Sequence, residues 1–412
     1  MNIKSIILAL AITPLFLACG NQKSESERFI NENIAFAVAQ TELMLQNVGA
    51  PTGRNYPRSM NDYGELTVTN MYEWTPGFFP GSLWYLYELT GDPKWREHAR
   101  EWTQSLEPLR TFTRHHDLGF MMFDSFGNAM RLAPQPGDEE ILIESARSLA
   151  TRFNHDAGVM RSWNTFRSWN SFEPQYQLPV IIDNLMNLEL LFWAASVTGD
   201  RSLYDIAVQH ADFSIKHFFR EDFGTYHLVA VDPYGEILGK YTAQGFSDNS
   251  TWARGQAWAI YGLVMTYRET GYARFRDFAI GAADFFLNNL PEDLVPLWDF
   301  NVQMEGFTPG YRSRAVTFQE KLKDASAAAI VSSALFELGE LIDCRHYIDM
   351  AIRILRSLAS PSFRAELGTN ANFLLMHSVG SIPHWFEVDR PLVYADYYFL
   401  EALVRYRRWL NR

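Results

Sequence analysis

The sequence is nearly free of cysteine, with Cys19 and Cys344 as its two thiols in 412 residues. It therefore lacks the paired cysteines of a disulfide framework or of a cysteine zinc site. It also lacks an HExxH zinc helix, a phosphate-cradling glycine loop and a GxSxG nucleophile elbow. His115, His116 and Asp117 are adjacent on the chain, and neighbouring histidines on a loop do not easily share one ion. We therefore expect no metal and no cofactor.

Basic runs are missing as well. The 36 Lys and Arg residues against 48 Asp and Glu residues give a net charge of −12. A nucleic-acid partner is not expected, because binding to phosphates requires clustered positive charge. An anionic substrate would need a site that is locally positive despite this overall charge.

The N-terminal segment Met1–Cys19 has the form of an export signal. Lys4 precedes an apolar stretch that is too short to span a bilayer, and LFLAC is followed by the polar run GNQKSESE. A small residue before a cysteine at this place resembles a bacterial lipobox. We expect lipidation of Cys19 and an exported protein in the periplasm or at the outer membrane, with plain signal cleavage as the alternative.

Helical hairpins dominate the remaining sequence, which is 47% hydrophobic and 15% aromatic. After a first helix at Ser24–Asn47, an apolar helix, a turn at glycine and an amphipathic helix recur. The copies cover Asn184–Phe218, Gln256–Leu290 and Ala327–Leu355, at a spacing near seventy residues. Stacked hairpins of this kind form either an open solenoid or a closed toroid.

Apolar inner helices and long polar loops before them favour the toroid. We therefore predict an all-α fold, an (α/α)6 toroid of helical hairpins, with residues 20–412 as one catalytic domain. The loops gathered on one rim are where a site is expected.

The stretch Ser247–Met265 predicts a polar loop that feeds a helix. Asp248 to Thr251 are residue types that cap helix N-termini, and Arg254 and Trp258 are spaced to share one helix face. A guanidinium beside an indole suits a sugar that carries a carboxylate. The alternative is an arginine that caps a neighbouring helix and a tryptophan in the core.

Two carboxyls stand in unusual surroundings. Asp117 lies on a predicted loop before Leu-Gly-Phe, and Asp183 lies among apolar residues at the start of a predicted inner helix. A carboxyl in apolar surroundings has a raised pKa and can deliver a proton near neutral pH. Paired acids of this kind are typical of glycosidases. Asp324 and Asp396 also begin inner helices, where helix capping is the simpler interpretation for both.

Long motifs in order along the chain resemble the unsaturated glucuronyl hydrolases of glycoside hydrolase family 88. The motifs are EWTPGFFPGSLWYLYELTGD, HDLGFM, IIDNLMNLELLFWA, STWARGQAWAIYG, KDASAAAI and YADYYFLEAL, from Met71 to Leu403. The resemblance implies an (α/α)6 toroid. It also implies removal of the 4,5-unsaturated uronic acid that polysaccharide lyases leave on oligosaccharides, which are the expected partners.

By the same resemblance, Asp183 is the catalytic acid and base and Asp117 the second essential carboxylate. Residues implied to bind substrate are His116, His227, Gln244 and Arg254, with Trp74, Trp169 and Trp258 as stacking walls. Taken alone, His227 and Gln244 are more simply structural, and Trp169 either lines a cleft or packs.

Other functions stay open at this level. Family 105, the unsaturated rhamnogalacturonyl hydrolases, shares the fold and the chemistry, although RGQAW is more like family 88. An ordinary inverting glucanase or a sugar epimerase would use the same toroid. A non-enzymatic glycan-binding lipoprotein is a further alternative, but a buried carboxyl contributes little to a pure binding site.

Overall fold

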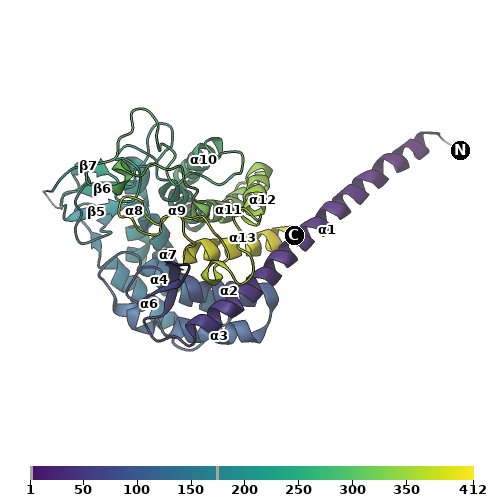
Figure 1. The fold of residues 1–412 in the computed structure, drawn as a ribbon, viewed down its shortest axis with the longest axis horizontal. Coiled ribbons are helices and arrows are strands. Elements are labelled where there is room, and N and C mark those ends of the chain that lie inside the picture. Colours follow the sequence, from purple (N-terminus) through teal and green to yellow (C-terminus); the bar gives the residue numbers. More distant parts are fainter. Residues whose placement is uncertain (1–2, 173–175) are drawn as a thin grey trace.

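The structure, a computed structural model, describes residues 3–172 and 176–412, with side chains described from residue 23 onward. Two concentric layers of helices form most of the fold (Figure 1). The inner layer consists of α2 (Phe78–Thr90), α4 (Leu118–Met122) with its continuation η2 (Phe123–Gly127) and α5 (Asn128–Leu132), α7 (Asn184–Thr198), α9 (Ala253–Thr270), α11 (Ala325–Leu341) and α13 (Val393–Leu410).

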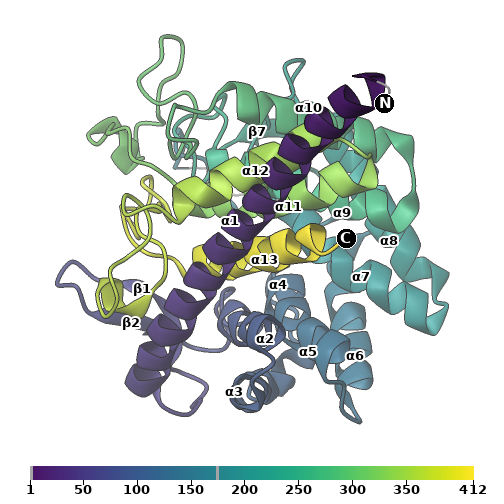
Figure 2. The ribbon, with the colours of Figure 1, turned by 90° about the vertical axis from the view of Figure 1, so that its right-hand side faces the viewer.

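The inner layer closes on itself. Going round, α2 contacts α13, α13 contacts α11, α11 contacts α9, α9 contacts α7, α7 contacts α4, and η2 returns to α2. Figure 2 shows α13 between α11 and α2, where the last helix of the chain meets the first inner one. This closure confirms the predicted (α/α)6 toroid and excludes the open solenoid.

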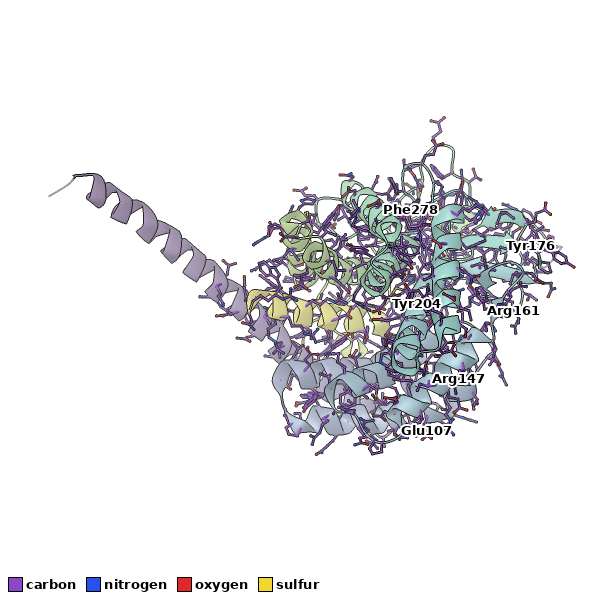
Figure 3. All side chains as sticks on the ribbon, turned by 180° about the vertical axis from the view of Figure 1, so that it is seen from behind. Glu107, Arg147, Arg161, Tyr176, Tyr204 and Phe278 are labelled. Carbon is purple, nitrogen blue, oxygen red and sulfur yellow. The ribbon has the colours of Figure 1, made fainter. Side chains whose placement is uncertain are left out.

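The outer layer covers the inner one with amphipathic helices. Each outer helix buries one face, as the alternation of burial along α12 illustrates. Figure 3 shows the side where Tyr204 of α8 and Phe278 of α10 lie on this layer. Its members are α1 (Ile3–Val48), α3 (Pro93–Gln104), α6 (Asp138–Ala150), α8 (Arg201–His217), α10 (Ala273–Asn288) and α12 (Arg345–Leu358).

The TGD turns explain why inner helices reverse so tightly into outer ones. Gly91 ends α2 in the left-handed conformation at φ 70°, which a residue without a Cβ adopts without strain. Asp92 then caps α3, because its carboxylate accepts from the Lys94 N–H, and Pro93 occupies the first helical position. Gly199 and Asp200 repeat the arrangement between α7 and α8.

One inner helix was not expected from the sequence. Asp117 was predicted to lie on a loop, but the residues after it form α4, a π-helical turn and α5 in succession. The wide turn breaks the 3.6-residue spacing on which helix prediction depends. Asp117 therefore lies at the start of an inner helix, as Asp183 does.

Short strands fill the connections at one end of the ring. β5 (Leu178–Ile181), β6 (Leu228–Val231) and β7 (Ile237–Tyr241) form an antiparallel sheet, with Ile181 opposite Leu228 and Leu228 opposite Tyr241. Two hairpins complete the strands, β1 (Tyr56–Met60) with β2 (Leu66–Thr69), and β3 (Phe153–Asn154) with β4 (Val159–Met160). Short 3-10 turns lie at η1 (Glu107–Thr111), η3 (Arg314–Val316) and η4 (Asn370–Asn372).

Helix α1 extends away from the ring towards its N-terminus (Figure 1). Its later part, beyond residue 23, packs against α13 and α2. Within the described part of the chain, no helix combines the length and the apolar character that crossing a membrane requires. The side chain of Cys19 lies outside the described residues, so its lipidation stays a prediction.

Candidate active site

The two carboxyls predicted from the sequence lie on neighbouring inner helices at the same end of the ring. Asp117 directly precedes α4 and Asp183 directly precedes α7. The two helices approach so closely that a Cβ on Gly119 would lie 2.5 Å from the Asn187 Cα. Glycine at this position is therefore required for the approach that brings the two acids together.

Asp183 does not cap its own helix. Its carboxylate makes no hydrogen bond to the first turn of α7, and its Oδ2 is buried without a hydrogen-bond partner. Burial first and the negative charge of Asp117 second raise the pKa of Asp183 to about 7, against the opposing effect of Arg254. A carboxyl with this pKa carries its proton for part of the time at neutral pH and can donate it.

Asp117 has the opposite electrostatic environment. Its Oδ2 lies 3.0 Å from His115 Nδ1 and its Oδ1 lies 3.4 Å from His116 Nε2. Although burial opposes ionisation, the two histidines hold the pKa of Asp117 below its usual value. One acid is thus kept ionised beside another that retains its proton for part of the time at neutral pH, which separates their roles.

His116 is fixed as a neutral ring that offers a lone pair. The Asn184 Nδ2 donates to the Met160 carbonyl oxygen and to Ser162 Oγ, so Asn184 Oδ1 is left to accept from His116 Nδ1 at 2.7 Å. The proton therefore lies on Nδ1, and Nε2 is an acceptor. Complete burial lowers the pKa of His116 to about 4, which keeps the ring uncharged.

His227 is fixed in the other tautomer. Its Nδ1 accepts from the backbone N–H groups of Ala243 and Gln244, at 3.0 and 3.2 Å. The proton therefore lies on Nε2, which is 3.8 Å from Asp183 Oδ2. Burial holds the pKa of His227 well below its ordinary value. The ring is a neutral hydrogen-bond donor beside the acid.

The small sheet explains how three distant residues meet. Asp183 follows the end of β5, His227 directly precedes β6, and Gln244 follows the end of β7. The strands are antiparallel, and Ile181, Leu228 and Tyr241 are paired in register. Asp183, His227 and Gln244 therefore lie at the same end of the sheet. No strand was expected here from the sequence, because four-residue strands inside loops carry little periodic signal.

Arg254 is more constrained than the sequence suggested. Its NH1 donates to Asp324 Oδ2 at 3.1 Å and also to the Val379 carbonyl oxygen, and its NH2 donates to the Gly380 carbonyl oxygen at 2.7 Å. The guanidinium also lies over the Trp252 ring, at 4.4 Å. Arg254 thus joins Asp324, which caps α11, to a loop, and a direct contact with substrate stays a prediction.

The helix that carries Arg254 also corrects the expected cap. α9 begins at Ala253 after Trp252, and none of the residues Asp248–Thr251 caps it. Asp248 instead accepts from the Thr242 N–H and helps to shape the loop after β7. Of the two other acids, Asp324 does cap α11, whereas Asp396 does not cap α13 and accepts from the backbone of a loop at Leu374 and Leu375.

The predicted tryptophan walls lie around the same end of the ring. Trp258 is wholly buried and packs against Phe120, which follows Asp117 by three residues. Trp74 packs on the other side of Phe120, at 5.6 Å between ring centroids. Trp169 donates to the Ala243 carbonyl oxygen and packs edge-on against His384. Their stacking on a sugar stays a prediction.

Polar atoms without a protein partner gather at this end of the ring. In the part of the chain with described side chains, ten buried side-chain nitrogen or oxygen atoms lack a hydrogen bond, and six of them belong to Asp183 and to the histidines and aromatic residues at this end of the ring. A buried polar group without a partner is costly, so such groups mark a ligand site more often than a core. The six are His116 Nε2, Asp183 Oδ2, His227 Nε2, Trp252 Nε1, Trp258 Nε1 and Tyr394 OH.

Sequence reasoning missed several of these residues. Asn184 fixes the His116 ring, Asn187 Oδ1 accepts from the Phe120 N–H at the start of α4, and Tyr394 packs against Trp74 and Trp258. Asn184 and Asn187 are polar residues in the otherwise apolar motif IIDNLMNLELL, and that was the available signal. In the described residues, no group of histidine, cysteine and carboxylate side chains could hold a metal ion.

A helical toroid with a paired protonated and ionised acid at one end of its inner ring defines the class, a glycosidase of the (α/α)6 type. The model of Glycosyl Hydrolase Family 88 matches residues 53–276. The chain belongs to this family.

Similar proteins cover nearly the whole chain. A curated unsaturated glucuronyl hydrolase from Formosa agariphila is 40% identical over 97% of both chains, and an unsaturated chondroitin disaccharide hydrolase from Streptococcus pyogenes is 33% identical over 93% of both. The crystal structure of an unsaturated glucuronyl hydrolase specific for heparin matches with a TM-score of 0.84 and 38% identity, covering 94% of this chain and 99% of that one. The glycosidase interpretation is thereby confirmed, and the family 105 alternative is not favoured.

Proposed function

We propose that this enzyme removes a 4,5-unsaturated uronic acid from the non-reducing end of oligosaccharides that polysaccharide lyases produce. The observation that carries the proposal is Asp183, a buried carboxyl with a pKa near 7 beside the ionised Asp117. The names of the similar enzymes support the same substrate class. Membership of the family supports this type of reaction, and the buried, unpartnered carboxyl of Asp183 is the reason for assigning the acid to it.

The reaction adds water across the C4=C5 bond of the sugar. Asp183 gives its proton to C4, which is nucleophilic because the double bond is conjugated to the ring oxygen. Water attacks C5, where positive charge develops. The carboxylate form of Asp183 accepts the proton that this water loses. The hemiketal at C5 then opens at its ring oxygen, and the hemiacetal at C1 releases the remaining glycan as an alcohol.

The two histidine tautomers place a hydrogen-bond donor beside Asp183 and an acceptor beside Asp117, which would orient the bound sugar. His227 Nε2–H is a donor beside Asp183, so it suits an oxygen lone pair on the substrate carboxylate or on the attacking water. His116 Nε2 is an acceptor beside Asp117, so it suits a sugar hydroxyl. Together with Asp117 they would hold the ring with C4 towards Asp183.

A panel of lyase-generated disaccharides tests the proposal. Turnover removes the ultraviolet absorbance of the conjugated double bond, so the rate is read directly. We expect loss of absorbance with at least one unsaturated disaccharide and none with its saturated counterpart. Cleavage of saturated glycosides at a comparable rate would instead assign ordinary glycosidase chemistry to this ring.

We also propose that the mature enzyme is exported and anchored by lipid at Cys19. The support is the sequence alone, a charged start, a short apolar stretch and a small residue before the cysteine. Expression in a bacterial host with labelled fatty acid should label the chain and place it in the membrane fraction. Cys19→Ala should remove both; label retained by that variant would overturn the anchor.

A further inference from the structure

One buried histidine has no part in the chemistry described so far. His210 lies on the outer helix α8 and is wholly buried, and its Nδ1 accepts from the Met160 N–H at 3.1 Å. The proton of the neutral ring is therefore on Nε2, which is buried without a hydrogen-bond partner. An apolar side chain of similar size would avoid that cost, so the acceptor at Nδ1 is the property that distinguishes this ring.

The ring of His210 is uncharged at neutral pH. Burial, and after it the nearby His116, lower the pKa of His210 to about 3. The Nδ1 lone pair therefore stays available to the Met160 N–H at every pH well above that value. His210 is a fixed acceptor in the outer layer of helices, and it does not gain or lose a proton while the enzyme works.

Three hydrogen bonds connect His210 to the active site. His116 Nδ1 donates to Asn184 Oδ1 at 2.7 Å, and Asn184 Nδ2 donates to the Met160 carbonyl oxygen at 2.8 Å. The third is the bond from the Met160 N–H to His210. Met160 is thus fixed at both its N–H and its carbonyl oxygen, one by the outer layer and the other by an inner helix.

The strip of residues 160–162 also holds both catalytic loops. The Ser162 carbonyl oxygen accepts from the His116 N–H at 3.2 Å, and Ser162 Oγ accepts from the Ile181 N–H at 2.9 Å. Arg152 donates to two carbonyl oxygens of the strip, at 2.8 and 3.0 Å. The strip is therefore held by Arg152 at one end and by His210 at the other.

The fixed strip decides which nitrogen of His116 carries the proton. Since Asn184 Nδ2 is used by Met160, the Asn184 oxygen faces His116 and requires the proton on Nδ1. If the Asn184 amide were free to turn, His116 could carry its proton on Nε2 instead. Nε2–H would then face Asp117 Oδ1, 3.4 Å away, and would donate to it. The acceptor that suits a sugar hydroxyl would be lost.

We propose that His210 is a positioning residue of this site. By holding Met160 from the outer layer, it keeps the His116 proton on Nδ1 and leaves His116 Nε2 free to accept from the substrate. Its effect on turnover rests on the proposed function, whereas the tautomer of His116 is a property of the protein alone. His210 itself does not contact the substrate.

Two substitutions of His210 test this role. His210→Leu removes the acceptor, whereas His210→Asn keeps one at the position of Nδ1. A long-range proton–nitrogen NMR spectrum of protein labelled on its histidine rings shows which nitrogen is protonated, and the His116→Gln spectrum identifies the His116 signals among the ten histidines. We expect His210→Leu to populate the second His116 tautomer and to lower kcat/KM on an unsaturated disaccharide about ten- to a hundredfold. His210→Asn should retain the single tautomer and most of the rate.

Leu203→Ala is the matched control, because Leu203 is buried on the same helix and has no hydrogen bond to the strip. It should lower Tm and, in the folded protein, leave the tautomer and kcat/KM unchanged. If His210→Leu does not fold, His210→Gln replaces it, since its acceptor lies one bond further out and misses the Met160 N–H. It should then show the second tautomer that His210→Asn lacks.

Three results would overturn the role of His210. They are a single Nδ1–H tautomer of His116 without the acceptor, an equal loss of rate in His210→Asn, and the same change of tautomer in Leu203→Ala. Absence of turnover by the unaltered protein would instead reject the proposed function, and the spectra would still decide whether His210 sets the tautomer.

Discussion

Both ends of the inner ring carry buried carboxyl groups, but these groups are hydrogen-bonded within the protein at one end, whereas the Oδ2 atom of Asp183 is left without a partner at the other. At the far end, Glu337 lies between Arg268 and Arg405, and Glu401 accepts from Tyr85, Tyr261 and Ser333. At the catalytic end, Asp183 Oδ2 and both histidine Nε2 atoms have no hydrogen bond within the protein.

This difference separates stability from function. A buried carboxylate that is fully paired helps to hold helices together, whereas an unpaired one is a cost that the fold must carry. The far end also encloses a cavity of about 490 Å³ lined by Glu401, and there Asp124 Oδ2 is the exception, since it is buried without a hydrogen-bond partner. Removing a charge should therefore cost activity at one end and stability at the other.

The largest effect is expected for Asp183→Asn. Loss of the proton donor should reduce kcat by about 10⁴-fold or more, because the same group serves as acid and base. The raised pKa means that ionised Asp183 destabilises the fold, increasingly as pH rises above its unfolded pKa. Thermal unfolding at neutral pH should thus show an equal or higher Tm. A variant with near-normal absorbance loss would remove Asp183 from the mechanism.

Asp117→Asn should follow, with a loss of about 10²- to 10⁴-fold in kcat/KM. Its negative charge is one cause of the raised pKa of Asp183, so without it that pKa should fall. Asp183 then loses its proton at lower pH, so the alkaline limb of the pH–rate profile should shift to lower pH. An alkaline limb that stays in place would mean that the two acids are not coupled.

Glu337→Gln tests the other end of the ring. Although burial opposes ionisation, Arg405 and Arg268 lower the pKa of Glu337 to about 2. Breaking a buried pair of this kind costs about 3–5 kcal/mol, measurable by urea unfolding. The stabilisation is present above the unfolded pKa and is lost as pH falls towards 2. kcat should remain near normal, and Glu340→Gln on the same helix serves as the control.

The smallest effect is expected for His115→Gln. His115 Nδ1 faces Asp117 Oδ2 at 3.0 Å and its Nε2 faces the Tyr72 carbonyl oxygen at 3.2 Å, while Glu73 adds negative charge nearby. Despite burial, these oxygens raise the pKa of His115, and its charge favours ionised Asp117. The variant should move the acid limb of kcat/KM to higher pH by less than about one unit.

His346→Gln, on the exposed part of α12, is the matched control for the histidine substitution and should leave the profile unchanged. An acid limb that does not move in His115→Gln would show that the charge of His115 does not set the ionisation of Asp117. A general loss of activity at every pH would instead assign His115 a role in holding the local fold.

Much of the fold was readable from the sequence because its signals are local. The TGD turns and the apolar inner helices predict helical hairpins. Asp183 is recognisable because it is a carboxyl among isoleucines and leucines. The inner helix after Asp117 was missed because a π-helical turn disrupts the spacing. The pairing of Arg254 with Asp324 and with two loop carbonyls was also unreadable, since it joins positions 70 and 126 residues apart.

The residues with orientation-dependent roles were the hardest to predict. A sequence identifies His116 and His227, but the proton on each ring is decided by Asn184 in one case and by the backbone of β7's following loop in the other. Those partners are set by tertiary packing, so the sequence alone could not show which ring nitrogen is the donor and which is the acceptor.

Ring closure also determines when the enclosed cavity around the two acids can form. Because α13 completes the ring against α2, a helix synthesised after the other inner helices contributes Tyr394 to the cavity wall. Every shorter nascent chain has its acids in place along the sequence and lacks the enclosure that tunes them. We therefore expect the enclosure around the acids to form late in synthesis, and a chain interrupted before α13 to lack it.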